Sequence, residues 1–395
     1  MKILHTSDWH LGQSFMGKSR EEEHHAFLAW LLTTIEKENI NVLIVAGDIF
    51  DTGTPPNYAL ELYYNFLTKL SLSSCENIII TAGNHDSIAT LKAPKQLLKA
   101  LNIHVITSGD ENENEVICIY NNEELEGIVC AVPFLRDYVV RQSFSGETMN
   151  DKEHSLTQGI KEHYNNVYKE AVLLSEKKDV PIIATGHLTT VGSKTSESER
   201  EIYIGGTLDI DSDFLGENFD YVALGHLHIN QAVGKDHIRY SGSPIPLSFS
   251  ESTSQKKVNI VDLKNKEVKV TELDVPLHRP LLVLRGDVEA ITKELEKVED
   301  KETWIEVHLK DDNPFHSNQV IREKAEELEL ILLAVKIDRV EQALHSADFD
   351  VISLDELNPL EVFERRMEQD ALEDKEFTKE LITNFKDIVN EVQNS

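Results

Sequence analysis

The stretch YVALGHLHINQ, residues 221–231, joins a predicted strand to a polar turn. Its first four residues are apolar and predict a β-strand that ends at Gly225. Two histidines follow, His226 and His228, with one leucine between them. Histidines are common at strand ends, so this stretch alone is compatible with an ordinary turn or with a binding site. The rest of the chain distinguishes the two.

Four more apolar runs resemble the first, and each is short, rich in valine and isoleucine, and nearly continuous. They are KILHT (2–6), NVLIVAG (41–47), NIIITAG (77–83) and VPIIATG (180–186). Such runs are typical of strands that are buried on both faces. Segments at 21–39, 55–70 and 150–177 lie between these runs and predict helices. The alternation predicts an α/β fold. Further strand-like runs indicate more than one sheet; they lie at 115–120, 127–134, 237–243 and 256–263.

The pattern changes close to residue 275. Residues 281–338 predict strand, helix, strand, helix and strand, which is a compact unit of its own. The acidic segment 348–359 predicts a linker, and amphipathic helices are predicted after it. We therefore expect three parts, which are residues 1–275, a small α+β unit over 276–345, and a linker with C-terminal helices over 346–395.

The composition restricts the function. The formal net charge of −31 argues against simple electrostatic attraction to nucleic acid or to anionic lipid. Bound metal ions can reverse the local field, so an acidic chain can still act on phosphates. Three cysteines without a CxxC pair indicate reduced thiols. With no signal peptide or membrane span recognised, we expect a cytoplasmic protein with no membrane association.

Each of the five predicted strands is followed by residue types that bind metal ions. These are Asp8 and His10, then Asp48, then Asn84, His85 and Asp86, then His187, and finally His226 and His228. In α/β sheets, ligands bind at the carboxyl ends of strands. A glycine directly before four of these groups allows a sharp turn there. Core packing does not explain five such coincidences, so the sequence predicts a metal site at this edge.

The number and kind of side chains indicate two ions. Seven candidate ligands are present, namely Asp8, His10, Asp48, Asn84, His187, His226 and His228. This is more than one ion uses, and it suits two ions that share a bridging carboxylate, for which Asp48 is the natural candidate. Two such ions about 3.5–4 Å apart can promote phosphoryl displacement. The mixture of imidazole, carboxylate and amide suits Mn, Fe or Zn better than Mg.

The motifs DxH, GDxxD, GNHD, GH and GHxH, in this order, resemble those of the calcineurin-like metallophosphoesterases. The resemblance covers the first 275 residues. It implies a four-layer αββα sandwich, followed by a capping unit, and two Mn²⁺ ions. It assigns one ion to Asp8, His10, Asp48 and His228. It assigns the other ion to Asp48, Asn84, His187 and His226.

The same resemblance implies two catalytic candidates. His85 is the general acid or the stabiliser of the leaving oxygen, oriented by a carboxylate. Asp51 is a partner of the site, at an offset where archaeal and eukaryotic relatives carry histidine. Asp86 is either a turn residue or a support of the site. Among the other histidines, we expect His5 to be packed within its strand. We expect solvated side chains at four positions: His24, His25, His154 and His163.

The variants HTSDWHLGQ, GNHDS, ALGHLHINQ and YSGSPIPLSFSE resemble a bacterial nuclease branch of the family. This implies exonuclease and endonuclease activity on DNA ends and hairpins, without sequence specificity. It also implies a large coiled-coil ATPase partner that binds the C-terminal helices and supplies the only ATP site. A homodimer through 56–71 and 88–101 would make a heterotetramer with that ATPase. The candidate phosphate contacts, each of them equally explained as solvated, are Lys18, Arg20, Lys194 and Arg200.

Two other functions stay open. The first is another two-metal phosphoesterase, although the protein phosphatases of this family carry GDxxDRG and GNHE where this chain has GDIFDTG and GNHDS. The second is a DNA-end-binding scaffold without catalysis. A scaffold is expected to have lost ligands, and no ligand is missing from the motifs here.

Overall fold

The computed structural model describes residues 1–110, 114–141, 148–176, 178–196, 198–199, 210–264, 266–310 and 314–337. The predicted linker and C-terminal helices over 346–395 lie outside the described residues, as does Arg200. Among the described residues, none of the helices combines the length and the apolar character that a membrane crossing requires.

The first sheet contains six strands in the order β14-β13-β1-β4-β5-β6. Their bounds are β1 Lys2–Thr6, β4 Val42–Ala46, β5 Asn77–Thr81, β6 Ile103–Ile106, β13 Lys257–Lys264 and β14 Glu267–Asp274. The strands β1, β4, β5 and β6 are parallel, and β13 returns antiparallel beside β1. The first, second and third predicted strands therefore lie side by side, with their carboxyl ends at one edge.

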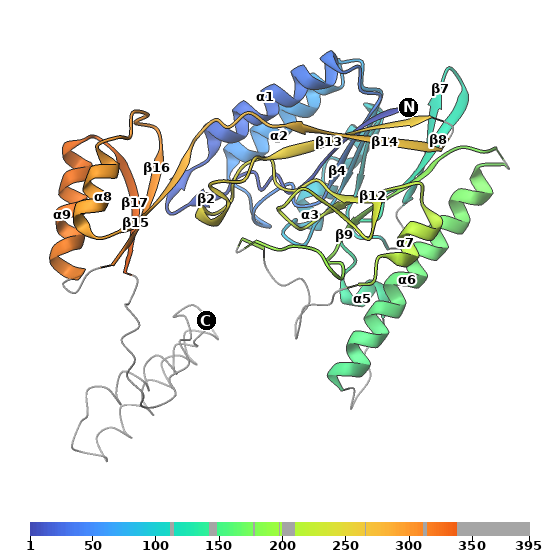
Figure 1. Cartoon of the computed structure of the whole chain (residues 1–395). Coiled ribbons are helices and arrows are strands. Elements are labelled where there is room, and N and C mark those ends of the chain that lie inside the picture. Colours follow the sequence, from blue (N-terminus) through green and yellow to red (C-terminus); the bar gives the residue numbers. More distant parts are fainter. Residues whose placement is uncertain are drawn as a thin grey trace, which may run out of the picture. The chain divides into compact units, whose positions relative to one another are not determined.

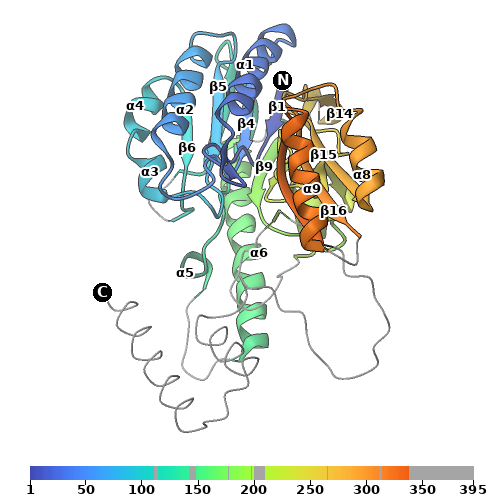
Figure 2. The same cartoon turned by 90° about the vertical axis from the view of Figure 1, so that its left-hand side faces the viewer.

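Helices cover the outer face of this sheet. They are α1 Glu21–Lys37, α2 Asn57–Leu70, α3 Ile88–Lys92 and α4 Lys95–Ala100. Phe27 and Leu31 of α1 and Phe66 of α2 belong to one buried cluster with Leu43 and Ile78 of the sheet. Figure 2 shows α1 and α2 beside β4 and β5. The apolar residues at helical spacing in the segment 21–39 thus form the inner face of α1.

The second sheet also contains six strands, in the order β11-β12-β10-β9-β8-β7. Their bounds are β7 Val116–Asn121, β8 Glu124–Cys130, β9 Ile182–His187, β10 Tyr221–Gly225, β11 Gln231–Val233 and β12 Lys235–Tyr240. The strands β8, β9, β10 and β12 are parallel. The helices on this side are α5 Asp137–Val140, α6 Met149–Leu174 and α7 Asp213–Asn218. Residues of α6 and α7 share a buried cluster with β9 and β10.

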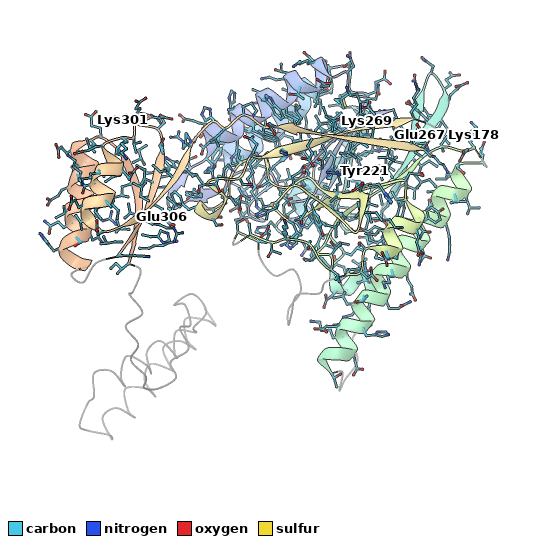
Figure 3. The ribbon with its side chains drawn as sticks, in the orientation of Figure 1. Lys178, Tyr221, Glu267, Lys269, Lys301 and Glu306 are labelled. Carbon is cyan, nitrogen blue, oxygen red and sulfur yellow. The ribbon has the colours of Figure 1, made fainter. Side chains whose placement is uncertain are left out.

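The two sheets pack face to face. Ile3, Ile44 and Ile79 of the first sheet form a buried cluster with Ile183 and Ala223 of the second. Figure 1 shows the resulting order of helices, sheet, sheet and helices. Tyr221, labelled in Figure 3, is fully buried inside the molecule, whereas Lys178 and Lys301 project from the surface. The predicted four-layer αββα sandwich is confirmed.

A smaller unit follows the two sheets. Its elements are β15 Leu281–Gly286, α8 Val288–Leu295, β16 Trp304–Leu309, α9 Pro314–Glu327 and β17 Ile331–Ile337. The predicted βαβαβ order is confirmed, and the three strands are parallel. Leu281 and Trp304 of this unit pack on Phe15 and Phe249. Phe15 belongs to the hairpin of β2 Ser14–Phe15 and β3 Lys18–Ser19, and Phe249 begins the short 3₁₀ helix η1 Phe249–Glu251.

Candidate metal centre

The backbone is strained at the predicted ligands. Asp8, His10, Asp48 and His226 have φ angles of 52°, 46°, 48° and 95°, in the left-handed region. Non-glycine residues there typically cost about 1–3 kcal/mol each and persist only where the surrounding structure holds them. Two main-chain hydrogen bonds hold the backbone at Asp8 and His10. The Asp8 N–H donates to Gly47 O at 3.1 Å, and the His10 N–H donates to Asp48 O at 3.0 Å. The loops after β1 and β4 are thereby interlocked.

Two of the glycines before the ligands are required for close approach rather than for turning alone. A Cβ atom at Gly225 would lie 1.8 Å from the main-chain oxygen of Ala46. A Cβ atom at Gly83 would lie 2.1 Å from Oδ1 of Asp48. No side chain fits either gap, so glycine is what lets β10 reach β4 and lets the loop after β5 reach Asp48.

The first group of ligand atoms belongs to Asp8, His10 and His228, which lie within 4.8 Å of one another and are all buried. Nδ1 of His10 lies 3.2 Å from Oδ1 of Asp51. Nε2 of His10 is buried and has no hydrogen-bond partner among the described residues. Buried polar atoms are rarely left unsatisfied, so this nitrogen fits a metal ligand.

The second group belongs to Asp48, His187 and His226, again buried and within 4.8 Å of one another. Oδ1 of Asn84 lies 2.8 Å from Nε2 of His187. Oδ2 of Asp48 lies 3.2 Å from Nε2 of His187 and 3.7 Å from Nε2 of His10. Asp48 therefore belongs to the second group and also approaches His10 of the first, and all seven predicted ligands meet at one edge of the two sheets.

Main-chain and carboxylate contacts join the loops that carry these side chains. The His226 N–H donates to Oδ1 of Asp8 at 2.8 Å, which bridges the two sheets. The carboxylate of Asp86 accepts three main-chain N–H groups, from Gly83 at 2.9 Å, Ile49 at 3.1 Å and Phe50 at 2.9 Å. Asp86 is thus a support that ties the loop after β5 to the loop after β4.

His85 and Asp51 are half-buried, whereas the carboxylate and histidine ligands are buried. Nδ1 of His85 lies 2.8 Å from the main-chain oxygen of Asp51. We expect a carboxylate to orient His85. In this contact the partner of its Nδ1 is instead the main-chain carbonyl of Asp51. The His10 and His85 rings lie 4.9 Å apart between centroids. His85 is therefore beside the ligands but more accessible than they are.

The site brings buried acids and bases into competition for protons. Burial raises the pKa of the Asp8 carboxyl to about 7. Burial lowers the pKa of His187, but the charge and hydrogen bond of Asp48 outweigh it and raise that pKa to about 9. Burial lowers the pKa of His226 to about 3, which keeps that ring neutral. Neutral imidazoles and carboxylates are the forms that bind metal ions.

The prediction that Arg20 contacts phosphate is wrong. Arg20 is fully buried; its Nε donates to Oε1 of Glu23 at 2.7 Å, and its guanidinium lies over the rings of Phe15 and Trp304. It is therefore enclosed by the small unit rather than free to meet DNA. Lys18 and Lys194 are exposed.

The sequence motifs do not reveal the residues that support His228. These residues are Ser198, Glu199, Glu251 and Lys256. Their only signal in the sequence is the YSGSPIPLSFSE stretch and the serine-rich loop after His187.

Comparisons with known proteins agree with this geometry. Residues 1–230 match the family model described as calcineurin-like phosphoesterase, and 278–371 match a model described as type 5 capsule protein repressor C-terminal domain. The chain therefore belongs to the calcineurin-like phosphoesterases, metal-dependent enzymes whose fold implies a site for two divalent ions. Relatives named as the D subunit of nuclease SbcCD are 40% identical in Escherichia coli K12 (95% of each chain), 34% in Rhodobacter capsulatus (72% and 71%) and 31% in Bacillus subtilis (78% and 79%). Within this class, the chain is a member of the family of SbcD nuclease subunits.

Proposed function

We propose that the chain is the nuclease subunit of an SbcCD-type complex and cleaves DNA phosphodiester bonds with two Mn²⁺ ions. The proposed activities are exonuclease action on duplex ends and endonuclease action on single strands and hairpins, in repair, recombination and replication. The observation that carries the proposal is that six of the seven proposed ligands form two buried groups. Asp48 of the second group lies 3.7 Å from Nε2 of His10 in the first, and the half-buried Asn84 lies 2.8 Å from His187. The word nuclease in the names of the relatives supports a nucleic acid rather than another phosphodiester as the substrate.

The proposal divides the ligands between the two ions. Asp8, His10 and His228 would hold one ion, and Asn84, His187 and His226 the other, with Asp48 bridging both. Four histidines among seven ligands favour Mn²⁺ over Mg²⁺, which prefers oxygen donors. When bound, two such ions supply a hydroxide near neutral pH and offset the charge of the phosphate. They also explain how a chain with a net charge of −31 can hold DNA at this edge.

His85 is the proposed general acid. Its Nδ1–H donates to the main-chain carbonyl of Asp51 at 2.8 Å, which fixes the orientation of the ring. In the proposed role, the protonated ring donates its Nε2–H to the leaving oxygen. Asp51 supports this role through its main chain and holds His10 through its carboxylate at 3.2 Å. General acid catalysis contributes about 10²–10⁴ in rate, which sets the loss expected for His85→Ala.

The proposed assembly is a homodimer that binds two copies of an SbcC-like ATPase. Exposed apolar side chains support the homodimer through the segments 56–71 and 88–101. Leu97 and Leu101 lie within the second segment and Leu72 directly follows the first, with exposed fractions of 70%, 44% and 85%. The proposed ATPase contact is made by the helices within 346–395, and ATP would act only through that partner. A division into residues 1–275, 276–345 and 346–395 and a cytoplasmic location remain part of the proposal.

The deciding experiment uses the purified chain with Mn²⁺, with and without its ATPase partner and ATP. The substrates are linear duplex DNA, hairpin DNA and a small aryl phosphodiester. We expect DNA cleavage that rises with partner and ATP and falls by about 10²–10⁴ in His85→Ala while Mn²⁺ stays bound. Cleavage of the small ester without any DNA cleavage would favour another phosphoesterase, and DNA binding without hydrolysis of either substrate would favour the scaffold.

A further inference from the structure

His228 lies beyond the end of β10, on a loop rather than in a strand, yet it is held at three points. Its N–H donates to Oε1 of Glu199 at 2.8 Å. Its carbonyl accepts from Nζ of Lys256 at 3.0 Å. Its ring Nδ1 lies 2.6 Å from Oγ of Ser198. Main chain and ring are thus both fixed by residues from outside β10.

Glu251 is the centre of this arrangement. Its carboxylate is only 3% exposed, and it accepts the hydroxyl of Ser198 and the hydroxyl of Ser196 on Oε1. The Lys256 ammonium lies 2.5 Å from Oε2, and the Leu247 N–H donates to the same oxygen at 3.1 Å. A buried carboxylate with a cation at this distance is ionised and has no proton of its own to give.

The direction of the hydrogen bonds follows from a count of protons. A serine hydroxyl has one proton, and Ser198 donates it to the ionised Glu251. Oγ of Ser198 can then only accept from His228, so the ring proton of His228 is on Nδ1. Nε2 of His228 is left with a lone pair, which is the form that binds a metal ion.

We propose that Ser198 and Glu251 are positioning residues for His228, forming a carboxylate–hydroxyl–imidazole relay that sets its tautomer and ring orientation for the first ion. This inference rests on the proposed role of His228 as a ligand. The relay makes that ion dependent on Ser198, in the segment between β9 and α7. Among the described residues, no hydrogen bond joins Ser198 or Glu251 to Asn84, His187 or His226. Groups of this kind typically contribute about 10–100-fold in metal affinity.

The test measures Mn²⁺ binding without DNA, by equilibrium dialysis and by the exchange-coupled paramagnetic resonance signal of a manganese pair. We expect Ser198→Ala to weaken one of the two ions by about 10–100-fold and to convert the coupled signal to that of a single ion. Ser198→Thr keeps the hydroxyl and should restore both. Glu251→Gln should act like Ser198→Ala. Glu272→Gln, at an exposed carboxylate that pairs with Arg239 and Lys257, is the matched control and should bind as the wild type does.

The outcomes separate this inference from the proposed ligand set. If His228→Ala loses one ion but Ser198→Ala and Glu251→Gln bind both ions with wild-type affinity, the relay is wrong and the ligand assignment stands. If His228→Ala itself binds two ions normally, the assignment fails and the relay fails with it. If Glu251→Gln does not fold, Ser198→Ala and Ser198→Thr decide, because Ser198 is only half-buried.

Discussion

At the scale of single residues, burial separates side chains that look alike in the sequence. His24 and His25 are neighbours near the start of α1, and we expect both to be solvated. His25 is exposed, but His24 is completely buried, so that prediction is wrong for His24. Arg20, four residues before His24, and Glu23, directly before it, are buried with it. The enclosure of this turn comes from distant parts of the chain, since Arg20 donates to Pro246 O at 2.7 Å.

The first prediction concerns acid stability. Burial lowers the pKa of His24 to about 3, so below its usual value of 6.5 the unfolded chain takes up a proton that the folded chain refuses. Stability from this residue is therefore present above pH 6.5 and lost as the pH falls. At about pH 5 the loss is about 2 kcal/mol. We expect His24→Leu to reduce the stability difference between about pH 7 and pH 5 by that amount in denaturant unfolding with chelator.

His25→Leu is the matched control, one position along the same helix and exposed, and it should leave the pH dependence unchanged. An identical pH dependence in His24→Leu and in the wild type would show that His24 is not the group that refuses the proton.

At the scale of elements, the site depends on how closely strands of the two sheets approach. The strand ends lie where the sequence predicts them. Their position alone does not bring the ligands of the two sheets together, because the sheets must also approach each other closely. The N–H of His226 meets Asp8 at 2.8 Å although the two residues are 218 positions apart. This contact needs β10 close to β4, which in turn needs glycine at position 225.

The second prediction is that Gly225→Ala separates the sheets at the site. Its Cβ would lie 1.8 Å from Ala46 O, a main-chain atom that cannot rotate away. Relieving such overlap costs about 1–3 kcal/mol or more, and we expect Tm to fall and Mn²⁺ affinity to drop at least as strongly as in a ligand variant. Gly53→Ala is the control, because its Cβ would meet only Cβ of Ser87 at 3.6 Å. Normal Mn²⁺ binding by Gly225→Ala would contradict the requirement for close approach.

At the scale of the whole molecule, the protonation of Asp8 and His187 affects both metal binding and the stability of the fold. The folded pKa of His187, about 9, lies above its usual 6.5, so its contribution to stability is complete below pH 6.5 and is lost as the pH rises through about 9. The pKa of the buried Asp8 carboxyl is about 7, above its usual 3.8, so its ionisation destabilises the folded chain increasingly as the pH rises from 3.8 to about 7. Both groups destabilise the chelated protein as the pH increases.

The third prediction follows from this linkage. Mn²⁺ must displace the protons of Asp8 and His187, so binding strengthens as the pH rises. We expect the increase in Tm caused by saturating Mn²⁺ to grow between pH 6.5 and about pH 8, while Tm of the chelated protein falls. Scanning calorimetry at several pH values measures both. A constant or shrinking effect of Mn²⁺ over this range would contradict the protonation of these two ligands.

The fourth prediction concerns the division of labour along the chain. The proposed ligands lie between positions 8 and 228, far from the C-terminal segment. Deleting the residues after 350 should therefore abolish binding to the SbcC-like ATPase and leave two Mn²⁺ ions bound. Co-purification with the ATPase and metal analysis of the truncated chain give the two readouts. Persistent binding of the ATPase would exclude the C-terminal helices as the contact.

The sequence by itself determined the buried strands, the helices between them and the kinds of side chain at the strand ends. Each of these depends on local composition and spacing, such as the apolar run before His226. Only the tertiary structure decided which strands share a sheet, since β13 joins β1 from a distant part of the chain in pairs such as Asn259 with His5. It also decided that Arg20 and His24 are buried and that Ser198 and Glu251 hold His228. The physical reason is that burial and hydrogen bonding at these positions come from segments distant in sequence, and no local pattern encodes their meeting.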